Sequence, residues 1–145
     1  MLGSLSKWMI PFTILLLVGC TQQTHKSLYD IGEDYQVISS FGQNIEILPK
    51  QDAINASQLI PPKVTEAAWN HDYILAKQLE LVDDPTNPGS QIPNPKKENY
   101  WIIDIKNNQR FGPYTKKQFE AQKKEFRISS SLQLKSISDT NTSNH

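Results

Sequence analysis

The chain has little of what most enzymes and metalloproteins need. Its 145 residues include a single cysteine, Cys20, so no disulfide can form within the chain. The histidines, His25, His71 and His145, stand far apart, so no zinc-binding pattern is present. Basic and acidic residues balance at 15 each, which argues against nucleic acid as a partner. We therefore predict no metal, no cofactor and no nucleic acid, and a fold held together by its apolar core.

Motifs for nucleophilic or acid–base catalysis are also scarce. No serine lies in a Gly-x-Ser-x-Gly elbow, and His71 and Asp72 share a polar loop in which such residues are common for conformational reasons. The carboxylates of Asp72, Asp83, Asp84 and Asp104 would have to converge in three dimensions to act together. The sequence thus favours a non-catalytic protein, with an enzyme as the alternative.

The apolar run over residues 9–18 is about half as long as a membrane-spanning helix. Lys7 precedes it, and a polar segment follows at residues 20–27. This layout predicts a signal peptide over residues 1–19 and a tether over residues 20–27.

The end of this run, Leu17-Val18-Gly19-Cys20, resembles the lipobox of bacterial lipoproteins. The resemblance implies cleavage between Gly19 and Cys20, an S-diacylglycerol group on Cys20 and an N-palmitoyl group on its new amino terminus. Two or more acyl chains hold a protein stably at a bilayer. We therefore expect a lipid anchor at the cell membrane or outer membrane, with the domain facing away from the cytoplasm.

Alternating apolar and polar residues predict the strands. Residues 34–39 and 44–48 fit one hairpin, residues 64–69 and 73–82 fit another, and residues 100–105 give the strongest strand signal.

Two details refine this prediction. The segment 73–82 is apolar on one face except at Lys77 and alternates less cleanly on the other, which favours a central strand covered on both sides. Residues 83–99 contain four prolines and one glycine, which predicts a mobile loop without a sheet ladder.

One helix is predicted near the C-terminus. Thr115 and Gln118 fit a capping box, and Phe119 and Phe126 would share one face of the helix that follows.

Residues 128–137 predict a last strand, and residues 138–145 a polar, disordered tail. The whole pattern predicts an α+β domain over residues 28–137, an antiparallel meander of about five strands with one C-terminal helix.

The large aromatic residues concentrate in the second half of the domain. Most are expected in the core, because aromatic side chains are usually buried. If several were exposed together, they would form a binding surface. The candidates for such a surface are Trp69, Tyr73, Tyr100, Trp101 and Tyr114.

Two families share parts of this pattern. Residues 69–78, 100–104 and 112–115 are similar to small bacterial lipoproteins that are classed only as a domain of unknown function. Residues 101–104 and 112–119 look like the strand, Gly-Pro-aromatic turn and helix of domains named for a Gly-Tyr-Phe motif, some of which bind proline-rich peptides. Because the Gly-Tyr-Phe element itself is absent, we interpret this likeness as local.

The leading hypothesis is therefore a membrane-anchored envelope lipoprotein that binds another envelope protein or component without catalysis. One alternative is an enzyme that acts on an envelope substrate. Another is a small inhibitor or immunity lipoprotein, which a neighbouring gene for a toxin or lytic enzyme would indicate.

Overall fold

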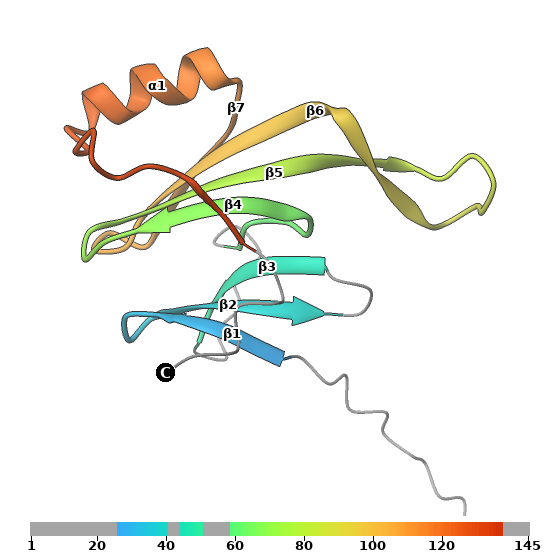
Figure 1. Ribbon diagram of the computed structural model, residues 1–145, viewed down its shortest axis with the longest axis horizontal. Coiled ribbons are helices and arrows are strands. Elements are labelled where there is room, and N and C mark those ends of the chain that lie inside the picture. The colour runs from blue at the N-terminus through green and yellow to red at the C-terminus, as the bar shows by residue number, and fades with distance from the viewer. Residues whose placement is uncertain (1–25, 41–43, 51–58, 138–145) are drawn as a thin grey trace, which may run out of the picture.

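The computed structural model describes residues 26–40, 44–50 and 59–137. These residues form three layers: helix α1, a five-stranded sheet below it, and a three-stranded sheet on the far side (Figure 1). The predicted α+β class is confirmed. The described part of the chain contains eight strands in two sheets, whereas the sequence predicted about five strands in one meander.

The three-stranded sheet is antiparallel, in the order β1 (Lys26–Ile31), β2 (Tyr35–Ser40) and β3 (Asn44–Pro49). The predicted first hairpin is confirmed as β2 and β3. Strand β1 was not predicted and begins two residues inside the expected tether. Its pairing with β2 shifts register between Ser27 and Tyr29. Apolar and polar residues therefore do not alternate regularly along β1, and the sequence gives no clear strand signal there.

The five-stranded sheet has the order β7-β6-β5-β4-β8, with every pairing antiparallel. Its strands are β4 (Val64–Trp69), β5 (Tyr73–Asp83), β6 (Gln91–Asp104), β7 (Gln109–Tyr114) and β8 (Lys135–Ser136). The second predicted hairpin is confirmed as β4 and β5. The last predicted strand is reduced to the two residues of β8, which return to pair with the far edge of β4.

The prediction of a loop without a ladder over residues 83–99 is wrong, because β6 starts at Gln91 and pairs with β5. Strand β7 pairs with β6 only from Tyr100 onward, so the first half of β6 is a sheet edge. Prolines are tolerated at an edge, where no neighbour requires their missing N–H. This half of β6 and the end of β5 form a ribbon that projects beyond the rest of the sheet (Figure 1).

The five-stranded sheet is covered on both faces, as predicted for residues 73–82. On β5, Ile74 and Ala76 belong to the cluster between the two sheets, whereas Leu75 belongs to the cluster under the helix. The first cluster also contains Trp101 and Ile103, and the second contains Ile102. Successive residues of a strand therefore serve different layers, as the two-residue period of a strand requires.

Helix α1 (Lys116–Glu125) begins with the predicted capping box. The Thr115 hydroxyl accepts from the Gln118 amide at 3.3 Å, and the Thr115 amide donates to the Gln118 side chain at 2.9 Å. Phe119 is the buried residue of the helix, and Phe126 at its C-terminus packs against Phe111 with ring centroids 4.9 Å apart. Within the described residues, no helix has the length and apolar character that crossing a bilayer requires.

Candidate functional site

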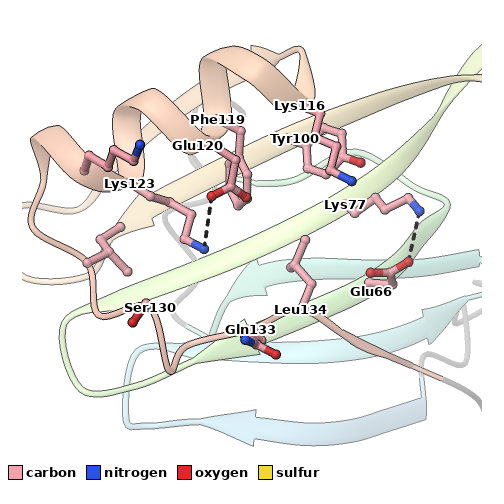
Figure 2. Close-up of a pocket in the computed structure, with 12 residues that line it drawn as sticks. Glu66, Lys77, Tyr100, Lys116, Phe119, Glu120, Lys123, Ser130, Gln133 and Leu134 are labelled. Carbon is pink, nitrogen blue, oxygen red and sulfur yellow. Dashed lines mark hydrogen bonds and ion pairs between the residues drawn. The ribbon is translucent and has the colours of Figure 1, made fainter.

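A groove of about 510 Å³ lies between α1 and residues 128–134, above the helix-side face of the central sheet (Figure 2). This volume falls within the range of roughly 300–1,000 Å³ that is usual for ligand sites. The helix, strands β4 to β6 and the returning C-terminal segment all contribute side chains to it. The groove therefore joins segments that are far apart in the sequence.

The floor of the groove holds a network of paired charges. The ammonium nitrogen of Lys77 lies 2.9 Å from an oxygen of Glu66 and 2.8 Å from an oxygen of Glu98. The Tyr100 hydroxyl donates to the other Glu98 oxygen at 2.9 Å. Lys77 reaches the groove because it lies two residues after Leu75 and shares its helix-side face. Figure 2 shows the Lys77–Glu66 pair on the floor.

The network fixes the protonation state of its members. Hydrogen bonds to Glu98 and Glu66 raise the pKa of Lys77 above its ordinary value of 10.5. The hydrogen bonds from Lys77 and Tyr100 lower the pKa of Glu98, and burial raises the pKa of Tyr100. Near neutral pH the lysine and Glu98 are charged and the phenol is protonated. Such groups are poorly suited to proton transfer at that pH, because an efficient acid or base has a pKa close to it.

The helix wall of the groove carries lysines. The Lys123 ammonium lies 3.7 Å from Glu120 and 5.5 Å from the centroid of the Phe119 ring, and its side chain is only 13% exposed. A separation of 3.7 Å is too long for a hydrogen bond. Lys116 and Lys124 also line the groove, and neither makes an ion pair within the described part of the chain.

The opposite wall is neutral. It is built from Ser130, Gln133 and Leu134 of the segment that follows the helix. In Figure 2, Leu134 projects between the Lys123 and Lys77 side chains, so an apolar group separates two ammonium groups. The site therefore offers a ligand both positive charge and apolar contact.

The other buried polar cluster is structural. Gln78, which is 3% exposed, donates to the Pro62 carbonyl at 3.0 Å and accepts from the Trp101 indole at 3.2 Å. It also accepts from the Asn99 amide at 3.4 Å. These bonds occupy both ends of the Gln78 amide, which therefore links β5 and β6 to the segment before β4.

The structure does not gather the five candidate aromatics on one surface. Trp69 and Trp101 pack on the side between the sheets, whereas Tyr73, Tyr100 and Tyr114 pack on the helix side. Tyr100 and Trp101 are buried, as expected for core aromatics, and the other three are half-buried. Of the five, Tyr100 alone lines the groove.

The four aspartates considered for catalysis do not converge. Asp72 and Asp104 lie near the start of β5, while Asp83 and Asp84 lie at its far end. A strand of 11 residues is roughly 30 Å long. Hydrogen bonds from Thr86 lower the pKa of Asp84 and hold its carboxylate within a turn. In the described ranges, no three His, Cys, Asp or Glu residues are grouped so that they could hold a metal ion.

Several predicted features lie in parts of the chain outside the described ranges. Gly19, Cys20 and His25 lie outside the described residues, as do the signal peptide and the tail over residues 138–145. His71 is exposed in the loop between β4 and β5.

The fold and groove define a small three-layer α+β domain with a charged groove under its helix. The family model described as "Protein of unknown function (DUF3997)" matches residues 32–138, well over half of the chain, and the protein belongs to this family. The predicted kinship with an uncharacterised family is thereby confirmed. Comparison with curated proteins and with solved structures gives no match.

Proposed function

We propose that this protein is a lipid-anchored envelope protein that binds another envelope component through the groove, without catalysing a reaction. The observation that carries the proposal is the groove itself, in which the Lys77 ion-pair network forms the floor. Its charges are already paired, so the floor is suited to hold a shape and not to exchange protons.

The sequence before the domain supports the anchor. Cys20 follows a lipobox-like segment and would carry the N-palmitoyl and S-diacylglycerol groups. Strand β1 begins at Lys26, and six residues of chain reach at most roughly 20 Å. A lipid on Cys20 would keep the domain close to the cell membrane or outer membrane, where its partner would be found.

The distribution of carboxylates supports binding over catalysis. An envelope enzyme with dispersed aspartates needs them in one cleft, but the four aspartates occupy opposite ends of β5. Within the described residues, the carboxylates that contact Lys77 on the groove floor are those of Glu66 and Glu98, and both are paired with its ammonium group.

Membrane fractionation and intact mass of the wild type and of Cys20→Ala test the anchor. We expect the wild type to carry a mass increment of lipid size and to sediment with membranes, and the variant to do neither. A soluble, unmodified wild type would overturn this part of the proposal.

Photo-crosslinking tests the binding site in the full chain in its native cells. A photo-crosslinking amino acid would replace Ser130, which is exposed on the wall of the groove. The control places it at Lys106, which is exposed in the turn between β6 and β7 and does not line the groove. We expect a specific adduct with an envelope component from position 130 and none from position 106. Identical products from both positions would contradict a binding role for the groove.

A further inference from the structure

We infer that the groove receives an acidic segment of a partner protein, with carboxylates on the lysines of α1 and an aliphatic side chain beside Leu134. This inference rests on the proposed function, because it names the partner chemistry of the same groove. Charge complementarity and the apolar lining residues Ile128 and Leu134 carry it.

Lys123 lacks a hydrogen-bond acceptor within the described protein. Its side chain is 13% exposed, yet the nearest carboxylate, that of Glu120, is 3.7 Å away and is itself on a side chain that is 53% exposed. An ammonium group has three donors, and leaving them unmet in a partly buried place is unfavourable. A ligand carboxylate in the groove would supply the missing acceptor. In Figure 2 the Lys123 ammonium points from the helix into the groove.

The groove is more basic than the chain as a whole. Four lysines line it against two glutamates, whereas the full sequence has equal numbers of basic and acidic residues. Both glutamates lie within ion-pair distance of a groove lysine, so neither is free to attract a cation. Lys116 and Lys124 add further positive charge and make no ion pair within the described chain, although the charge of Lys116 also acts on Glu98.

The spacing of the helix lysines suits an extended peptide. Lys116 and Lys123 are seven residues apart, which is about two helical turns and roughly 10 Å along the axis. About three residues of an extended chain cover this distance. A peptide with acidic side chains a few residues apart would therefore meet both lysines at once.

The apolar residues of the groove favour a polypeptide over a phosphate-bearing polymer. Ile128 is 9% exposed, and Leu134 is half-buried next to the lysines. A peptide that combines acidic and aliphatic side chains covers both kinds of surface, whereas a phosphate polymer leaves the apolar part uncovered.

The test measures binding of two synthetic peptides to the purified full chain, isolated from its native cells in detergent. One peptide alternates Glu and Leu, and the other has Gln in place of each Glu. We expect the Glu peptide to bind at least about tenfold more tightly, because hydrogen bonds to charged groups are the stronger ones. Inorganic phosphate, as a competitor, should not displace it at equal concentration.

Matched lysine variants of α1 test whether the peptide binds in the groove. Lys123→Gln and Lys116→Gln should each weaken binding of the Glu peptide roughly tenfold, whereas Lys117→Gln should not change it. Lys117 is exposed on the same helix but does not line the groove. Lys116 is exposed as well, so its variant keeps the test valid if Lys123→Gln folds poorly.

Each contrary outcome has one meaning. Equal binding of the two peptides, displacement by phosphate, or an equal loss in Lys117→Gln would overturn the acidic-segment inference. If the Ser130 crosslinker captures an envelope component while the Glu peptide does not bind, the proposed function stands and this inference fails. If the peptide binds but the protein is neither anchored nor crosslinked, the proposed function fails and this inference stands.

Discussion

Gln78 is a buried polar side chain in the middle of β5, and replacing it with leucine should destabilise the fold. The change leaves the Trp101 indole N–H and the Pro62 carbonyl without their partner. Each unmet buried group costs about 1–3 kcal/mol, and burying the leucine recovers about 1–2 kcal/mol. Taking the middle of each range, we expect Gln78→Leu to lower the free energy of unfolding by about 2–3 kcal/mol.

Urea unfolding followed by far-UV circular dichroism measures this loss without using the tryptophan signal. Trp101→Phe removes the indole donor, so in that background Gln78→Leu should cost about 1–2 kcal/mol less than in the wild type. Gln109→Leu, at an exposed position of β7, is the control and should stay within about 0.5 kcal/mol of the wild type. A Gln78→Leu protein as stable as this control, or costs that simply add in the double variant, would refute the reasoning.

Three further predictions concern the backbone, the helix and the ion pairs. Gly112→Ala should destabilise by more than about 2 kcal/mol, because its φ is +127° and a Cβ there would lie 2.7 Å from a backbone oxygen. A Cβ at Gly32 would meet nothing within 4 Å, so Gly32→Ala is the matched control and should cost about 1–2 kcal/mol. Equal thermal denaturation midpoints for Gly112→Ala and Gly32→Ala would contradict this prediction. Thr115→Ala removes the helix cap and should cost about 1 kcal/mol in urea unfolding, whereas Thr115→Ser should restore most of it. Lys77→Met should lower stability most at neutral pH. Because Lys77 lowers the pKa of Glu98, the stability difference between the wild type and Lys77→Met should shrink as the pH falls below 4.5. A stability difference that grows in acid would contradict a stabilising Lys77–Glu98 ion pair.

The sequence predicted elements well where alternation is regular and the turns are short. The hairpins β2–β3 and β4–β5 meet that condition, and the start of α1 was predicted from its capping box. The start of β6 was missed because its prolines argue against a ladder, and only the structure shows that this stretch lies on an edge. The second sheet was missed because periodicity shows which face of a strand is buried but not what covers it.

The groove could be predicted only in part. Its members lie on β4, β5, β6, α1 and the C-terminal segment, and no spacing in the sequence brings these elements together. Lys77 was the one signal, because it interrupts the apolar face of a predicted central strand. A charged residue at such a place needs a partner, and the structure supplies Glu66 and Glu98. The candidate aromatics did not predict the groove, because they pack in the core clusters on both faces of the sheet.

The projecting ribbon of β5 and β6 has a consequence for how these proteins behave when crowded. An exposed strand edge invites a strand of another molecule to pair with it. Pro93 and Pro95 occupy the outer strand of this ribbon and present no N–H to an incoming strand. The salt bridge between Lys97 and Glu80 places charges across the two strands of the ribbon. The same prolines that obscure this strand in the sequence thus protect the β6 edge of the ribbon from pairing with another molecule.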